Sequence, residues 1–316
     1  MPTLCVNTPG SKVRLVSERL EIHGHDPDTG TAVLRVVPIR DVDRVILQET
    51  AQVSSEALAA LLREEVPVAI LAGNGRYLGG FQPASPAQGA WRVRQYQASL
   101  DPAFTLQMAG RIVTAKIYNQ RRVLQRMAAN RDSDVTPALN AIGALFNDSA
   151  RAGSVDEVRG YEGAAAARYF QEWATFLPKA FPFERRSTRP PLNPVNACLS
   201  FGATLLYHEA VSAIHAGGLD PALGLLHATE DRRWSLALDL MEPFRPVLVE
   251  ALAIDLFTHQ ILNEKHFRPH DGGVYLNDEG RAKFIVQYER RMERQFMSEC
   301  VGYRTTLRQQ LENQAV

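Results

Sequence analysis

The sequence predicts an α+β protein, with a β-rich N-terminal domain at residues 1–85 followed by an all-helical domain at residues 86–316. Three observations predict this division. Apolar residues recur every second position in the first part and about every 3.6 positions after it. A segment rich in Pro, Ser and Gly, residues 82–89, separates the two parts. The length of 316 residues also exceeds what one compact core commonly holds.

The first part contains short apolar runs separated by turn-forming residues, which predict strands. These runs are residues 13–16, 20–23, 32–37 and 45–47. Residues 24–30 are typical of a loop. Asn74-Gly75 stands between the apolar runs 68–71 and 77–81 and predicts a hairpin, because this dipeptide suits a tight turn. Residues 54–63 interrupt the strands with a serine-initiated helical pattern.

Beyond the linker, the apolar spacing predicts helices and a proline-rich loop around residues 178–194. The expected helices are near residues 90–100, 103–130, 136–147, 155–176, 193–217, 221–228, 244–263 and 277–314. The uncharged run 190–208 contains prolines and asparagines and is a poor membrane span. The first residues lack a cationic segment followed by an apolar core, so we expect a soluble, cytoplasmic protein with no membrane partner.

Composition narrows the function classes. The formal net charge is zero, from 35 basic and 35 acidic residues, which excludes a uniformly basic nucleic-acid coat. A local basic face is still open, because residues 91–126 contain seven basic residues against the single acid Asp101. The three cysteines form no CxxC pair, so neither a disulfide framework nor a thiolate zinc site is predicted.

One candidate chemical group is Glu162, which precedes Gly163 and four alanines. These small side chains would let another helix or a ligand approach the backbone closely. A carboxylate in such a packed place is costly unless it is paired, metal-bound or hydrogen-bonded. The alternative is a solvated glutamate near a helix start, where the helix dipole favours it.

Two further segments carry candidate groups. His227 ends an apolar run that follows a Gly/Pro turn, and the alternative for it is a buried core histidine with its own partner. Asp239 and Glu242 are three residues apart, so a helix would place them on one face, although Pro243 disfavours helical geometry at Glu242. Two adjacent carboxylates repel unless a cation lies between them. The alternative is a plain ion pair between Glu242 and Arg245.

Together these groups offer mostly hard oxygen atoms and one imidazole. Such a donor set suits Mn²⁺ or Mg²⁺ better than zinc, which prefers more His or Cys ligands. Spacing alone does not establish that Glu162 meets the other groups, because 65 residues separate it from His227.

Three motifs resemble the signatures of a known family. They are Tyr161-Glu-Gly163, Gly224-Leu-Leu-His227 and Ser235-Leu-Ala-Leu-Asp-Leu-Met-Glu-Pro-Phe-Arg-Pro246, and residues 196–202 and 217–221 also match. The pattern is similar to that of the CRISPR-associated integrase-endonucleases, the catalytic subunits of the spacer-acquisition complex. The resemblance implies that Glu162, His227 and Glu242 are catalytic and hold a divalent metal. It also implies that Asp239 is a nearby acidic residue, either a ligand or a support for one.

The resemblance further implies an activity and partners. The 3′-hydroxyl ends of captured DNA would be joined to a repeat array by transesterification, and DNA would be nicked when water attacks. Double-stranded and branched DNA would be substrates. The protein would form a homodimer through its β domains, bound to a small ferredoxin-like adaptation protein that bridges two such dimers.

DNA would need basic side chains that contact phosphate. The candidates are Arg232, Arg233 and Arg245 near the proposed site, and Arg92, Arg94, Arg121 and Arg122 in the basic segment. A solvated helix face with internal ion pairs is the alternative for the second group. Two other functions stay open: a non-catalytic DNA-binding scaffold of the same fold, and a metal-dependent phosphohydrolase of a small substrate.

Overall fold

The N-terminal strands form two four-stranded sheets in the computed structural model, which describes residues 3–6, 8–25, 30–72, 77–84, 89–129, 131, 133–298 and 302–315. One sheet has the order β1 (Thr3–Val6), β5 (Arg44–Gln48), β7 (Val68–Leu71) and β8 (Tyr77–Phe81). The first three strands run parallel, and β8 is antiparallel to β7. The other sheet has the order β4 (Ala32–Pro38), β3 (Arg19–His25), β2 (Lys12–Val16) and β6 (Gln52–Val53).

The core of this N-terminal part is formed where the alternating apolar residues of the strands meet helix α1 (Ser55–Arg63). Val13, Leu20, Val45 and Leu61 are all at most 1% exposed. The predicted strands and the predicted helix are therefore confirmed. The predicted Asn74-Gly75 turn, residues 26–29 of the predicted loop and residues 85–88 of the predicted linker lie outside the described residues.

Helices dominate the chain from residue 89 onward and the α+β class is confirmed, although this part is not all-helical as predicted, because it also contains two two-stranded sheets. The α-helices are α2 (Gly89–Ser99), α3 (Pro102–Ala129), α4 (Thr136–Ser149), α5 (Val155–Trp173), α6 (Pro194–Ala216), α7 (Ser235–Met241), α8 (Ala251–Thr258), α9 (Asp278–Met292) and α10 (Leu307–Gln314). Short 3₁₀ segments follow β4 and α5, at Ile39–Asp41 and Ala174–Phe176, and a third spans Glu264–His266. A π-helix at Arg245–Glu250 joins α7 to α8.

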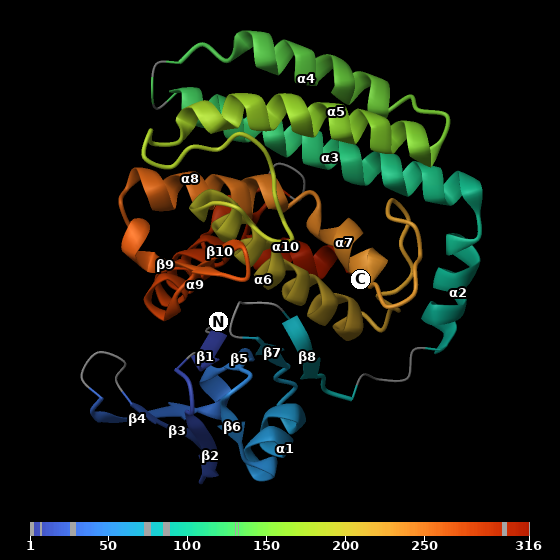
Figure 1. The fold of residues 1–316 in the computed structure, drawn as a ribbon. Helices are drawn as coiled ribbons and strands as arrows, with labels where there is room; N and C mark the ends of the chain where they lie inside the picture. The colour runs from blue at the N-terminus through green and yellow to red at the C-terminus, as the bar shows by residue number, and fades with distance from the viewer. Residues whose placement is uncertain are drawn as a thin grey trace.

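Figure 1 shows α3, α4 and α5 side by side as one layer at the top, α6 in the middle, and the N-terminal strands at the bottom. α6 meets the length and apolarity of a membrane span, but 72% of its apolar window is buried inside the protein, which is the position of a core helix. Its Gly202 lies against Val249 and Phe284, where a Cβ atom would come within 3 Å of both side chains. The absence of a side chain there lets the π-helix region pack closely on α6.

Three of the predicted helices were wrong in detail. Residues 221–228 form turns, because the amides of this segment donate to a side chain instead of to a helical ladder. The predicted helix 244–263 begins as the π-helix and ends at Thr258. The predicted helix 277–314 is interrupted by the small sheet of β11 (Phe296–Met297) and β12 (Arg304–Thr305), and a hairpin of β9 (Phe267–His270) and β10 (Gly273–Leu276) precedes it.

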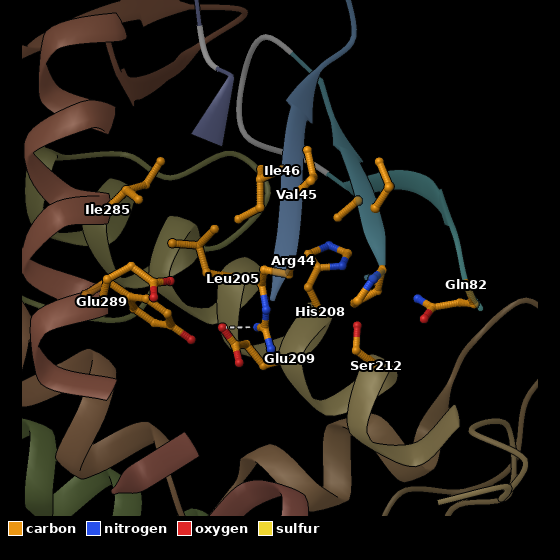
Figure 2. A pocket seen from close by; sticks show the side chains of 14 residues that line it. Arg44, Val45, Ile46, Gln82, Leu205, His208, Glu209, Ser212, Ile285 and Glu289 are labelled. Atoms are coloured by element: carbon orange, nitrogen blue, oxygen red, sulfur yellow. Dashed lines mark ion pairs between the residues drawn. The ribbon is translucent and has the colours of Figure 1, made fainter. Parts of the chain in front are cut away.

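A buried ion network joins the N-terminal sheet to the helical part. Arg44 of β5 pairs with Glu209 of α6, as the dashed line in Figure 2 shows. Arg308 of α10 lies 3.5 Å from the same Glu209 carboxylate and 2.7 Å from Glu289 of α9. Arg44, Glu209 and Glu289 line a cavity of about 20 Å³. The network fixes the β-rich part against three helices of the other part.

Candidate active site

Two glutamates from distant segments converge on one ammonium group. Lys116 of α3 donates to Glu162 Oε1 and to Glu242 Oε2. Arg245 donates to the other oxygen of Glu242 at 2.8 Å. The side chains of Lys116 and Glu242 are 7% and 5% exposed, whereas Glu162 is 27% exposed. The cluster is therefore buried on one side and open to solvent at Glu162.

The charges in this cluster stabilise one another. Burial by itself raises the pKa of Glu242, but Arg245 and then Lys116 outweigh it and lower the pKa to about 2. Burial also disfavours the Lys116 ammonium, yet attraction to Glu242 and to Glu162 leaves its pKa raised. Glu250 of the π-helix interacts electrostatically with the same two cations, Arg245 and Lys116, but burial outweighs their effect and raises its pKa. The Glu242 carboxylate is thus kept ionised inside the protein by two cations.

Glu242 is presented by an unusual turn between α7 and the π-helix. It follows the last residue of α7 with helical torsion angles, so the proline after it does not force it out of the helical region as the sequence suggested. Asn119 of α3 donates to the Pro243 carbonyl at 2.7 Å. Pro243 and Pro246 have no amide hydrogen and cannot donate to a regular helical ladder here. The turn is instead held by α3, the helix that carries Lys116.

His227 lies in a loop that a single aspartate organises. Asp239 is fully buried and accepts hydrogen bonds from the backbone amides of Leu225, Leu226 and His227, at 2.5, 3.0 and 2.9 Å. Its Oδ1 also lies 2.6 Å from His227 Nδ1. In the neutral ring whose Nδ1–H donates a hydrogen bond to this carboxylate, Nε2 carries the free lone pair. Asp239 thus orients a histidine whose side chain is 34% exposed.

The carbonyl groups of the same loop are also held. Arg159 of α5 donates to the Leu226 carbonyl at 2.7 Å. Ser235 donates to the Ala228 carbonyl at 2.8 Å, and the Arg233 guanidinium binds the same oxygen. A Cβ atom on Gly224 would approach the His227 carbonyl to 2.1 Å. Glycine is therefore required there for the loop to close.

The four predicted site residues fall into two pairs. The structure brings Glu162 and Glu242 together around Lys116, and it brings His227 and Asp239 together. In the described residues, no group of three or more His, Cys, Asp or Glu side chains is arranged to hold a metal ion. The two pairs are linked along the chain: Asp239 precedes Glu242 by one helical turn, and Arg159, which binds the His227 loop, precedes Glu162 by one turn of α5.

Four of the small residues of α5 face open space, whereas Ala165 is buried in the core of the helical part. Gly160, Gly163, Ala164 and Ala167 are all exposed and share one face by their spacing. A Cβ atom on either glycine would meet no atom of the described residues within 4 Å. On this exposed face, packing by another helix, one of the two approaches that the sequence allowed, is not realised by any of the described residues. A ligand has room to approach the backbone beside Glu162.

The arginine candidates differ in availability. Arg245 and Arg233 already have protein partners, the first in Glu242 and the second in Glu230 at 2.7 Å. Arg232 is exposed and adopts a left-handed backbone conformation. Four lie on α2 and α3: Arg92 donates to the Gly218 carbonyl at 3.1 Å, Arg94 covers the Trp91 ring, Arg121 lies against Gly143, and Arg122 is exposed.

Sequence reasoning missed Lys116, Asn119 and Arg159 as site residues. Lys116 had a signal that could have found it, because it stands among Val113, Ile117 and other members of the buried stripe of α3. A lone lysine at such a position needs a buried anion. Asn119 and Arg159 bind backbone carbonyls of remote turns, so no local pattern marks them.

Comparison with known proteins gives a family match. Residues 4–290 match the family model described as CRISPR associated protein Cas1. The chain is 33% identical over 301 residues to the CRISPR-associated endonuclease Cas1 1 of Thermodesulfovibrio yellowstonii, covering 93% of this chain and 92% of that protein. It is 34% identical over 284 residues to a CRISPR-associated exonuclease Cas4/endonuclease Cas1 fusion of Geobacter sulfurreducens, covering 87% of this chain. The chain spans about half (51%) of that fusion's length.

Three solved structures share the architecture of this chain. A Cas1 protein from Thermotoga maritima has a TM-score of 0.81 at 25% identity, with 99% of this chain and 94% of that chain covered. A casposase bound to integration product has a TM-score of 0.87 at 26% identity, with 100% and 90% covered. A Cas6-RT-Cas1–Cas2 complex matches with a TM-score of 0.79 at 27% identity, over 99% of this chain and 34% of that chain.

Proposed function

The chain belongs to the Cas1 family of endonucleases and integrases, and on that premise we propose that it is a divalent-metal-dependent DNA integrase that also nicks DNA. The single observation that carries the proposal is the convergence of Glu162 and Glu242 on one cationic point. A second pair, His227 and Asp239, stands one helical turn away along the chain. Carboxylates and an imidazole in this arrangement suit a hard divalent ion and the chemistry of phosphodiesters.

The donor set fits Mn²⁺ or Mg²⁺ by its chemistry. Glu162 and Glu242 would supply carboxylate oxygens, and His227 would supply Nε2. Asp239 would act through His227, because its oxygens are already bound to the ring and to three backbone amides. We therefore place Asp239 as the residue that positions the histidine and not as a ligand.

In the proposed reaction, a bound divalent ion would neutralise the attacked phosphate and lower the pKa of the attacking hydroxyl. The protein's own residues provide the setting. Asp239, Arg159 and the Ser235 hydroxyl hold the His227 loop in one shape before DNA arrives. Asn119 holds the turn that carries Glu242. The 3′-hydroxyl of captured DNA would be the attacking group in integration, and water would be the attacking group in nicking.

The open face of α5 supports a long substrate over a small one. Gly160, Gly163 and Ala164 leave space beside Glu162 where the backbone of a duplex could approach. The exposed Arg232 and Arg122 are available to phosphates, and Arg92 and Arg94 extend the basic surface along α2. We expect DNA affinity to fall with rising salt concentration, since such contacts release counterions.

The test is plasmid nicking and strand transfer with purified protein, with Mn²⁺ or with a chelator. We expect Glu162→Gln, His227→Ala and Glu242→Gln each to lower both activities at least 100-fold, because each removes one donor of the set. Glu264→Gln, at an exposed glutamate, is the matched control and should leave both activities unchanged.

Other outcomes would support the alternatives. Salt-sensitive DNA binding without metal-dependent cleavage by the wild-type protein would contradict the proposal in favour of a scaffold. Hydrolysis of a small phosphate ester without plasmid nicking would favour the phosphohydrolase. Full activity in any one of the three substituted proteins would remove that residue from the mechanism.

We further propose that the protein works in the cytoplasm as a homodimer joined through its β-rich part. Strand β4 lies at the edge of its sheet and exposes Leu34 and Val36, at 55% and 47%. An exposed apolar edge strand is unfavourable unless a partner covers it. Light scattering should therefore give twice the chain mass for the wild type and less for Leu34→Asp, and a wild-type monomer at micromolar concentration would contradict the dimer.

A small ferredoxin-like adaptation protein is the further partner that we propose. A related solved assembly contains Cas2 beside a Cas1-containing chain, which supports a protein partner for this chain as well. The test is co-expression and co-purification. We expect the two proteins to co-purify with each other, and neither to co-purify with an unrelated control protein.

A further inference from the structure

Lys116 is an unusual residue in the buried stripe of α3. Its neighbours on that stripe include Val113 and Ile117, and its own side chain is 7% exposed. A buried ammonium is costly unless anions surround it. Here its hydrogen bonds go to Glu162 and Glu242, the two carboxylates that the proposed function assigns to a metal ion.

We propose that Lys116 competes with the divalent ion for these two carboxylates: its ammonium is their counter-cation in the ion-free protein, and ion binding displaces it. The proposal rests on the proposed metal-dependent function. The ammonium binds one oxygen of each glutamate from the space between them, which is where a bridging ion would bind. An ion that bridges the same two oxygens at about 2.0–2.6 Å would take the position that the ammonium holds between them, so both cations do not fit there at once.

The charges of the cluster support displacement. Lys116 and Arg245 carry two positive charges, and Glu162 and Glu242 carry two negative charges, so the ion-free group is balanced. A divalent ion added beside the ammonium would leave an excess of two positive charges in a largely buried place. Arg245 is fixed to the far oxygen of Glu242, whereas the lysine stem ends in an ammonium on a flexible chain. Lys116 is therefore the cation that moves.

This exchange would have two consequences for the protein. Without the ion, the glutamates neither repel each other nor present unpaired negative charge to DNA. When the ion binds, the lysine must be separated from both glutamates, and the free energy of this separation opposes ion binding. Ion binding to the wild-type protein is thus weaker than the donor set alone would give.

The test is a titration with Mn²⁺ alone, in which electron paramagnetic resonance reports the free ion. Lys116→Gln removes the charge and keeps a hydrogen-bond donor, so we expect it to bind Mn²⁺ at least tenfold more tightly. Lys116→Arg keeps the charge and should stay within threefold of the wild type. Lys179→Gln, at an exposed lysine, is the control for general loss of charge. Melting temperature gives a second readout: without ions Lys116→Gln should melt lower, and Mn²⁺ should raise its melting temperature more than that of the wild type.

Unchanged or weaker Mn²⁺ binding by folded Lys116→Gln would overturn the proposed competition. An equal gain in Mn²⁺ affinity in Lys116→Arg would also overturn it, because it would indicate an effect of packing and not of charge. If Lys116→Gln does not fold, the wild type still decides: modification of Lys116 by an amine reagent, measured by mass spectrometry, should rise severalfold with Mn²⁺, and constant labelling would overturn the proposal. Mn²⁺-dependent nicking by the wild type without tightening in Lys116→Gln would defeat the competition alone. Tightening without any nicking by the wild type would defeat the proposed function alone.

Discussion

Two clusters of buried charge in this molecule use the same kinds of side chain and differ in their access to solvent. At the junction with the N-terminal sheet, Arg44 and Arg308 close on Glu209, and the three side chains are 14%, 7% and 4% exposed. In the candidate active site Arg245 pairs with the equally buried Glu242, yet Arg245 itself is 27% exposed. The first cluster is closed, and the second opens to the surface.

We take this difference to separate a structural network from a site that is open enough to exchange partners. Every charge in the closed cluster is held by another element of the fold, so its members have no room to meet a ligand. Glu162 in the open cluster and His227 in its loop are 27% and 34% exposed. Buried ion pairs give little net stability but are costly to break, so only partial exposure lets such a cluster change its partners.

The largest expected effect comes from neutralising the shared carboxylate of the closed cluster. Glu209→Gln would leave Arg44 and Arg308 buried without their anion, and we expect a loss of about 3–5 kcal/mol in the free energy of unfolding. Urea denaturation measures this loss. DNA nicking by the protein that remains folded should stay within twofold of the wild type, because Glu209 does not contact the site.

The matched change in the open cluster is Glu162→Gln, which should give the reverse result. Lys116 keeps Glu242 as a partner and Glu162 is partly solvated, so we expect less than about 1 kcal/mol of lost stability. Nicking should be lost. If Glu209→Gln abolished nicking in folded protein, or if Glu162→Gln cost as much stability as Glu209→Gln, the distinction between the clusters would be wrong.

The second expected effect is acid sensitivity, and it should begin in the closed cluster. Burial, and then Arg44, lowers the pKa of His208 beside Glu209 to about 3. The unfolded chain therefore binds a proton on this histidine below about pH 6.5 that the folded protein does not bind until about pH 3. Stability should fall as the pH decreases through this window. Glu242, with a folded pKa of about 2, adds its share only below about pH 4.5.

The test is urea denaturation at pH 6.5 and at pH 4.5, where we expect a loss of about 1–3 kcal/mol in the wild type. Burial lowers the pKa of His215 as well, so this residue contributes a loss of the same sign. His208→Gln should remove a measurable part of the pH dependence, and His215→Gln another part. An unchanged difference between the two pH values in His208→Gln would show that acid acts elsewhere.

The sequence identified the fold class and the motif carboxylates, but not the contacts that separate the two clusters. Alternating and helical apolar spacings are local properties, so the strands and the long helices followed from them. The turns at residues 221–228 did not follow from such spacing, because backbone amides of this segment donate to the Asp239 side chain and not to helical carbonyl groups. Arg44 and Glu209 are 165 positions apart and carry no local signal of pairing. Only the fold brings such residues together.

The smallest expected effect concerns Arg159, which links the open cluster to the His227 loop through the Leu226 carbonyl. The Arg159 side chain is 41% exposed, so Arg159→Met should cost less than about 1 kcal/mol of stability. The freed loop would hold His227 less firmly, and we expect nicking to fall three- to tenfold, with a larger Mn²⁺ requirement. Arg168→Met, on the same helix and bound to Gln171 at 2.7 Å, is the control and should change neither quantity. Equal losses in both variants would show that α5 needs the charge itself, whereas a loss in Arg159→Met that excess Mn²⁺ restores would show that the arginine acts by positioning the histidine.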